Sequence, residues 1–181
     1  QHKNGVHWIT RAGDEYSGLQ PVLDWSRLPG LTASRVTPVV GKEVSPDFTG
    51  GLSDGRYGTS AFKFPEYRSS EEDGVTFHKA WFFGEGIISC LGSGITAGDG
   101  DQPLTTALAQ RRLRGDVRYG KKDKIRTLPV GTTRTARADW VHHDGIGYHV
   151  PGDTAITVAA REQSGSWTDL NATEPEDTVS A

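Results

Sequence analysis

The sequence contains no methionine and begins at Gln1. Because translation starts at methionine, we expect this chain to be a processed form or a piece of a larger protein. No apolar run approaches the roughly 18 residues of a transmembrane helix, and the opening residues, QHKNGVHWITR, contain no apolar segment of the kind found in signal peptides. These absences predict no membrane partner.

The sequence also has only one cysteine, Cys90, which excludes an internal disulfide. Because Cys90 lies in the apolar stretch IISCLG, we expect a buried and unreactive thiol. The net charge of −3 gives no global sign of a nucleic-acid partner. The one local excess of charge lies at residues 111–126, where eight basic residues stand against two acidic ones. This segment could contact a polyanion or form a solvated hairpin loop.

Glycine and proline, in contrast, are abundant, with 23 and 9 residues. Many turns favour short strands over long helices. Residues 79–95 predict a hairpin, because two apolar runs flank a Gly-Glu-Gly turn, and continuous apolar runs suit strands that are covered on both faces. Residues 155–160 alternate as a half-buried strand does. The sequence therefore predicts an all-β fold, an antiparallel β-sandwich.

Two further segments are ambiguous. Residues 105–115 have a Thr start and a Gly end that mimic helix caps, but they also alternate, and we interpret them as a strand. The acidic and polar residues 174–181 indicate a linker or a frayed end, which leaves residues 1–173 as one segment of a β-sandwich domain.

The stretch WVHHDGIGYHV at residues 140–150 could be a metal site, an acid–base pair or a hairpin. His142 and His143 are consecutive, so on a strand they point to opposite faces and cannot chelate one ion together. Asp144-Gly145 is a strong turn dipeptide. We therefore expect a hairpin and no metal site, with a structural or ligand-facing histidine, for which His143 is the candidate. We also expect Trp25, Trp81 and Trp140 to be core residues.

Two acidic residues, Asp14 and Glu15, lie in the stretch GDEY. A pair of carboxylates could serve glycosidase chemistry, which needs the two groups about 5–10 Å apart. Adjacent strand residues point to opposite faces, so the alternative of a turn with solvated acids remains open at this point.

Six stretches, in this order, resemble the central β-domain of polysaccharide lyase family 8, which includes hyaluronate, chondroitin AC and xanthan lyases. They are GDEYSGLQPVLDWSRLPGLTAS, FTGGLSDGRYGTSAFKF, KAWFFGEGIISCLGSGI, TTALAQRRLRGDV, WVHHDGIGYHVP and GSWTDLNA. The resemblance covers residues 5–173. One departure is Leu31-Thr32, where the family has Thr-Thr.

The resemblance implies that this chain is part of a galactose-mutarotase-like super-sandwich. It implies a secreted enzyme that cleaves uronic-acid-containing glycans by β-elimination without a cofactor. The catalytic Asn, His, Tyr and Arg of the family come from a helical toroid whose motifs are absent here, so we expect this chain alone to be inactive. Its partners would be the polyanionic polysaccharide, the toroid and the rest of the β-domain.

One family residue carries over to this chain. An early glutamate of the β-domain orders an Arg and a Tyr of the toroid, and the matching position is Glu15, with a charge-balancing role. As substrate-binding candidates we take Arg111, Arg112 and His143. The alternative to a lyase segment is a stand-alone carbohydrate-binding or structural β-module without catalysis.

Overall fold

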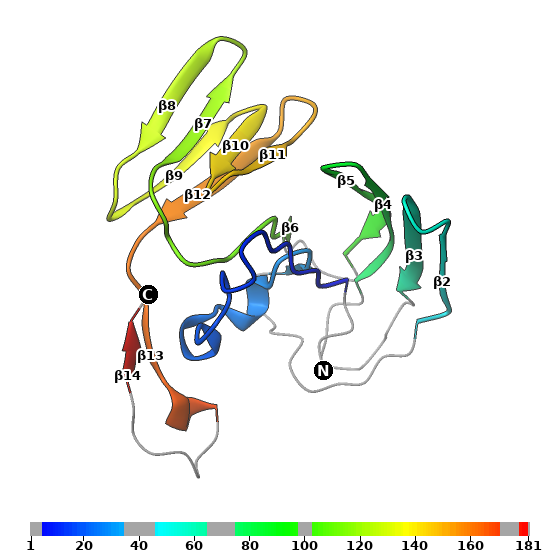
Figure 1. Ribbon diagram of the computed structural model, residues 1–181, viewed down its shortest axis with the longest axis horizontal. Coiled ribbons are helices and arrows are strands. Elements are labelled where there is room, and N and C mark those ends of the chain that lie inside the picture. The colour runs from blue at the N-terminus through cyan, green and yellow to red at the C-terminus, as the bar shows by residue number, and fades with distance from the viewer. Residues whose placement is uncertain (1–4, 35–45, 65–74, 98–102, 171–177, 181) are drawn as a thin grey trace. The chain divides into compact units, whose positions relative to one another are not determined.

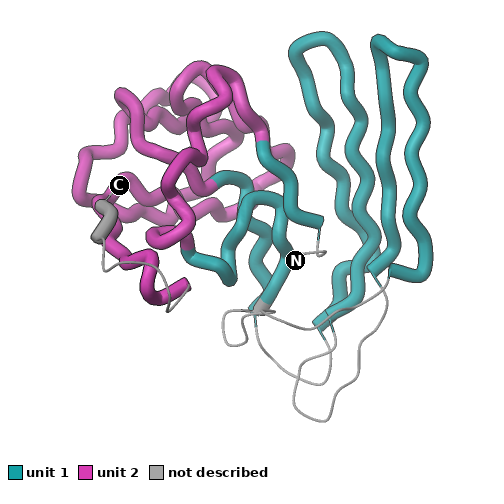
Figure 2. Tube along the Cα trace, turned by 60° about the horizontal axis from the view of Figure 1, so that its bottom comes forward, with its two compact units in different colours: residues 1–8, 24–109 teal, residues 9–23, 110–181 magenta. Residues whose placement is uncertain are grey.

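The computed structural model describes residues 5–34, 46–64, 75–97, 103–170 and 178–180, which form mainly β-strands joined by turns (Figure 1). All strand pairs are antiparallel, so the all-β prediction is confirmed. The chain forms two compact units, residues 1–8 with 24–109 and residues 9–23 with 110–181 (Figure 2).

The helical segments of the described residues are single 3-10 turns: η1 (Gln20–Val22), η2 (Trp25–Arg27) and η3 (Trp167–Asp169). Within the described ranges, no helix has the length and apolar character that a membrane crossing requires.

The first unit contains a four-stranded meander in which each strand pairs with the next. Its strands are β2 (Phe48–Ser53), β3 (Gly58–Phe64), β4 (Thr76–Gly84) and β5 (Ile87–Thr96). β4 and β5 form the hairpin expected at residues 79–95, with Gly84 opposite Ile87. A separate pair joins β1 (Thr32–Ser34) to β6 (Leu104–Thr106).

The core of this unit lies on one face of the meander, where Phe62, Phe64 and Phe77 are buried. Next to them lies Lys79, which is only 8% exposed. Its ammonium donates a hydrogen bond to the carbonyl of Gly30 and lies 4.8 Å from the centre of the Phe77 ring. Burial lowers the pKa of Lys79 to about 8, because the charged form loses its hydration.

The expectation of a buried Cys90 is wrong. Every residue of β5 is exposed, including Cys90. The apolar run predicted a strand covered on both faces, but β5 is an edge strand of the meander, with β4 as its partner. The neighbouring central strand β4 is also exposed at Phe82 and Phe83, so an apolar run by itself does not show that the faces of a sheet are covered.

The second unit contains the strand order β11-β10-β7-β8 and two strand pairs, β12-β9 and β13-β14. The strands are β7 (Val117–Lys121), β8 (Lys124–Leu128), β9 (Thr132–Arg137), β10 (Trp140–His143), β11 (Ile146–His149), β12 (Ala155–Ala160), β13 (Ser164–Ser166) and β14 (Thr178–Ser180). The β10–β11 hairpin and the strand at 155–160 are as expected. Residues 174–177 are not among the described residues, but 178–180 of the expected linker form β14.

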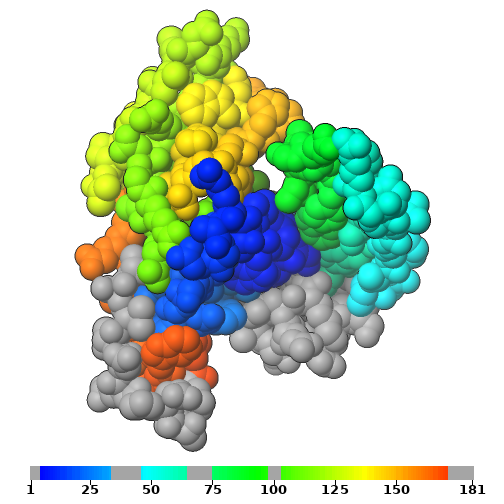
Figure 3. Space-filling view, in the orientation of Figure 1, coloured from blue at the N-terminus to red at the C-terminus, as the bar shows by residue number. Residues whose placement is uncertain are grey.

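One core holds this unit together. It draws side chains from the four-stranded sheet, from β12 and from the connection between β9 and β10: Val117, Tyr119, Leu128, Ala138, Val141, Ile156 and Ala160. Along β7, Val117 and Tyr119 are buried whereas Arg118 is exposed, as the two-residue period of a strand requires. The segment around β10 and β11 lies at the molecular surface, in yellow to orange in Figure 3.

The prediction of a strand over residues 105–115 is wrong beyond Thr106, where β6 ends. The following backbone bonds to loops instead. Ala107 exchanges hydrogen bonds with Gly30 and Leu31, and the amide of Arg112 donates to the carbonyl of Glu15. Hydrogen bonds to loops lack the regular two-residue spacing of a strand ladder. The strand therefore ends at Thr106, although the sequence continues to alternate.

Candidate functional site

The candidate site lies within the second unit and is built around Glu15. The chain folds back over this side chain, so that Glu15 Oε1 accepts from the amides of Arg11 and Ala12 at 2.6 and 2.8 Å, and Oε2 accepts from the amide of Gly13 at 2.9 Å. Glu15 is 1% exposed. The hydrogen bond from Ala12, followed by those of Arg11 and Gly13, lowers the pKa of Glu15 to about 2 against the opposing effect of burial. Glu15 is therefore a fixed buried anion.

Arg111 supplies the charge that balances this anion. Its Nη2 lies 3.2 Å from Glu15 Oε1 and 3.0 Å from Asp144 Oδ2, and its side chain is 2% exposed. A buried cation between two carboxylates is held in one orientation. The Nε and Nη1 groups of Arg111, together with the hydroxyl of Tyr148, have no hydrogen-bond partner among the described residues. The cluster therefore retains donor capacity that these residues do not use.

The turn of the β10–β11 hairpin carries Asp144 to this position. Asp144 and Gly145 both have positive φ, at 48° and 71°, as a two-residue hairpin turn of the I′ type requires. A Cβ on Gly145 would lie 2.0 Å from Nη1 of Arg11, so the guanidinium of Arg11 packs directly on this glycine. The Asp-Gly dipeptide thus forms the turn and also supplies the second carboxylate that pairs with Arg111.

Replacing Gly145 with alanine should lower the free energy of unfolding by about 1 kcal/mol, because an L residue is strained at this φ. The guanidinium of Arg11 can move aside, so contact with the new methyl adds little. Urea denaturation measures the change, with Gly147→Ala as the matched control, since a Cβ at Gly147 would meet no other atom within 4 Å. Equal stability of the two variants would contradict the strained turn.

Two further contacts fix the surroundings of the cluster. The buried His143 accepts a hydrogen bond from the amide of Arg114 at its Nε2, at 3.0 Å. Burial, and then the charge of Arg111, lowers the pKa of His143. Arg114 in turn forms two hydrogen bonds with the carboxylate of Asp14, at 2.9 and 2.8 Å. Asp14 and Glu15 therefore bind different arginines of one segment.

The structure brings Glu15 and Arg111 into direct contact and places His143 beside them. Arg112 is exposed, and its Nη2 donates to the carbonyl of Ser17. Contact of Arg111, Arg112 or His143 with a polysaccharide stays a prediction. Sequence reasoning missed Asp144, which it treated only as a turn residue. The described residues contain no group of three or more His, Cys, Asp or Glu side chains arranged to hold a metal ion.

Comparisons with known proteins identify relatives of this chain. The sequence model of "Polysaccharide lyase family 8, super-sandwich domain" matches residues 2–181. A chondroitinase-AC of Pedobacter heparinus is 33% identical over 98% of this chain and 25% of its own length. A hyaluronate lyase of Thermasporomyces composti is 32% identical over 91% of this chain and 22% of its own length. The structure of a Paenibacillus xanthan lyase matches with a TM-score of 0.82 and 25% identity, over 98% of this chain and 18% of that one.

The chain thus spans about a quarter or less of the length of these relatives. The match of the family model over nearly the whole chain, and the agreement of the fold with a solved lyase, confirm the resemblance drawn from the sequence. This chain belongs to polysaccharide lyase family 8, as a super-sandwich domain of that family.

Proposed function

We propose that this domain serves a lyase that cleaves uronic-acid-containing glycans of the hyaluronan, chondroitin or xanthan type by β-elimination. Membership of the family supports this proposal, as do the names of the relatives, which are lyases of three such polymers. We also propose an extracellular location, because an enzyme encounters large polysaccharides of this kind outside the cell. Detection of the protein in the medium of the source organism would test the location.

The reaction has three requirements. The charge of the uronate carboxylate must be offset, the proton at C5 must be removed, and the departing O4 must be protonated. The first step matters most, because a C–H beside an ionised carboxylate is a very weak acid, and fixed cationic or hydrogen-bonding groups lower this barrier. We propose that a helical domain supplies the groups for these steps, and that this chain alone is inactive.

We propose that Glu15 is a positioning residue in this enzyme. The observation that carries this assignment is its burial under three backbone amides and Arg111, which fixes both the 11–13 loop and the guanidinium. Among the substrate-binding candidates Arg111, Arg112 and His143, the exposed Arg112 is best placed to contact the polysaccharide directly.

Substituting Glu15 by glutamine in the enzyme that carries this domain together with its helical domain should lower kcat by about 100-fold, with little change in KM. Glutamine retains the size of the side chain but loses the charge that orients Arg111, and small displacements of positioning groups have effects of this order. The ultraviolet absorbance of the unsaturated uronate product, with hyaluronan, chondroitin and xanthan as substrates, measures the rate.

Glu162→Gln provides the matched control, because Glu162 is exposed and lies outside the cluster. The control should retain full activity. If none of the three polymers yields an unsaturated product, the proposed function is wrong. If product forms and Glu15→Gln retains its full rate, the lyase assignment stands and the role of Glu15 is wrong.

A further inference from the structure

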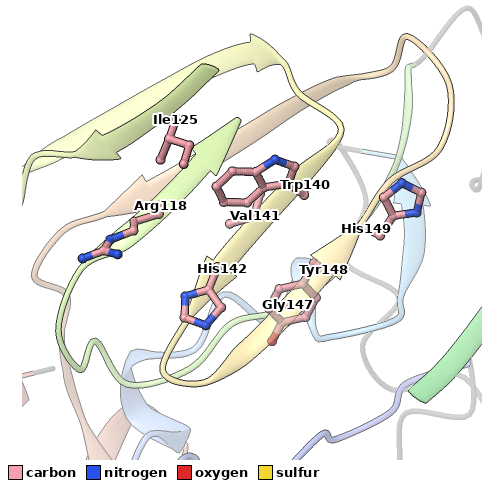
Figure 4. Close-up of a pocket in the computed structure, with 8 residues that line it drawn as sticks. All are labelled: Arg118, Ile125, Trp140, Val141, His142, Gly147, Tyr148 and His149. Atoms are coloured by element: carbon pink, nitrogen blue, oxygen red, sulfur yellow. The ribbon is translucent and has the colours of Figure 1, made fainter. Parts of the chain in front are cut away.

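A second feature of this unit is a shallow hollow of about 580 Å³ on the outer face of the sheet β11-β10-β7-β8. The residues that form it include Arg118, Ile125, Trp140, His142, Gly147 and His149 (Figure 4). Val141, which belongs to the buried core of the unit, and Tyr148, which packs against that core, also contribute to it, whereas the other six residues lie outside the core. Trp140 is half-buried, and the expectation that it is a core residue is wrong, because its strand register places it on the outer face.

Strand register explains why these residues gather on one face. Trp140 lies opposite His149 on β11 and opposite Gly120 on β7. His142 lies opposite Gly147 and opposite Arg118 in the same two strands. Residues directly opposite one another in a sheet share a face, so the sheet presents one tryptophan, one arginine and two histidines together.

Gly120 allows the indole of Trp140 to lie against the sheet. A Cβ at Gly120 would lie 2.6 Å from Cζ2 and 2.8 Å from Cε2 of Trp140, so any other residue would push the ring away. Figure 4 shows the indole broadside, with Arg118 and Ile125 on one side and His149 on the other. A flat ring supported from below offers its other face to a ligand.

Arg118 places a positive charge beside this ring. Arg118 lies 3.3 Å from Asp116, but both side chains are more than half exposed, at 57% and 61%. An exposed pair of this kind contributes little energy, so an incoming carboxylate can replace Asp116 on the guanidinium. Both His142 and His149 are exposed. Among the described residues that form the hollow, none is acidic.

We propose that this hollow binds an acidic oligosaccharide. The apolar face of one sugar ring packs on the indole of Trp140, a uronate carboxylate binds the guanidinium of Arg118, and the imidazoles of His142 and His149 hydrogen-bond hydroxyl groups. Small-molecule sites typically combine an aromatic or apolar surface with a few polar groups, as this hollow does. The proposal goes beyond the lyase function, because glycan binding here requires no reacting group.

Titration of the ¹⁵N-labelled chain with hyaluronan octasaccharide, followed by NMR, tests the site. The expected result is chemical-shift change at the Trp140 indole N–H and at the amides of Gly120 and Gly147. Arg118→Glu should weaken binding by about tenfold. The matched control is Arg134→Glu on β9, an exposed arginine outside the hollow, which should change the Kd by less than about twofold.

Two tryptophan variants separate stacking from charge. Trp140→Ala should weaken binding by about fivefold or more, whereas Trp140→Phe should retain most of the affinity, because phenylalanine keeps an aromatic face. A neutral chito-octaose should cause no comparable shifts. Because Arg118→Glu changes an exposed side chain, it remains informative even if Trp140→Ala does not fold.

Absence of shifts with hyaluronan octasaccharide would overturn the proposal, and so would equal binding of the neutral oligosaccharide. A Kd that is the same for the unchanged chain and for Arg118→Glu would overturn it as well. The lyase proposal does not depend on this outcome, since formation of the unsaturated product in the Glu15 experiment tests it separately.

Discussion

Replacing Arg111 with methionine should lower the free energy of unfolding by about 3–5 kcal/mol, the largest effect on stability that we expect in this chain. Arg111 is 2% exposed and lies between Glu15 and Asp144. Methionine fills a similar volume but leaves two carboxylates close together without a cation. The loss arises from this uncompensated charge rather than from packing.

Urea denaturation at neutral pH, followed by circular dichroism, measures this change. Arg112→Met is the matched control, because the neighbouring arginine is exposed and its loss should cost less than about 1 kcal/mol. If the two variants are equally stable, Arg111 does not pair with Glu15. The double variant with Glu15→Gln should be more stable than the sum of the single changes predicts, since the two residues are in contact.

Raising the pH from about 8 to about 10.5 should stabilise the fold through Lys79, by up to about 3 kcal/mol. Burial lowers the pKa of this lysine from 10.5 to about 8. Between these two values the unfolded chain binds a proton that the folded chain has released, so the free energy of unfolding rises with pH. Below pH 8 both states carry the proton, and the buried charge destabilises the fold by the full amount.

Urea denaturation at pH 7 and at pH 10 measures this dependence. Lys79→Met serves as the reference, because other groups titrate in the same interval and the difference between the two proteins isolates Lys79. The variant should lose the rise in stability, although its Gly30 carbonyl also loses a hydrogen-bond donor. If the free energy of unfolding changes with pH by the same amount in both proteins, Lys79 is not buried as the structure describes.

Much of the local structure could be predicted from residue patterns. The Asp144-Gly145 dipeptide predicts a tight turn because both residues tolerate positive φ, and the structure has that turn. The two apolar runs around Glu85 predict a hairpin, and β4 and β5 form it. Burial could not be predicted in the same way. Cys90 and Lys79 lie on neighbouring strands, but the apolar context of Cys90 did not indicate its exposure, and nothing local indicated the burial of Lys79.

The sequence by itself determined the antiparallel strands and tight turns, because period-two alternation and turn dipeptides act over a few residues, and its ordered motifs determined the family. Only the tertiary structure decided that Glu15, Arg111 and Asp144 form one buried ion cluster, and that Trp140 lies over Gly120. These contacts join segments far apart in the chain. They depend on the path of irregular loops and on strand register, neither of which leaves a periodic signal in the sequence.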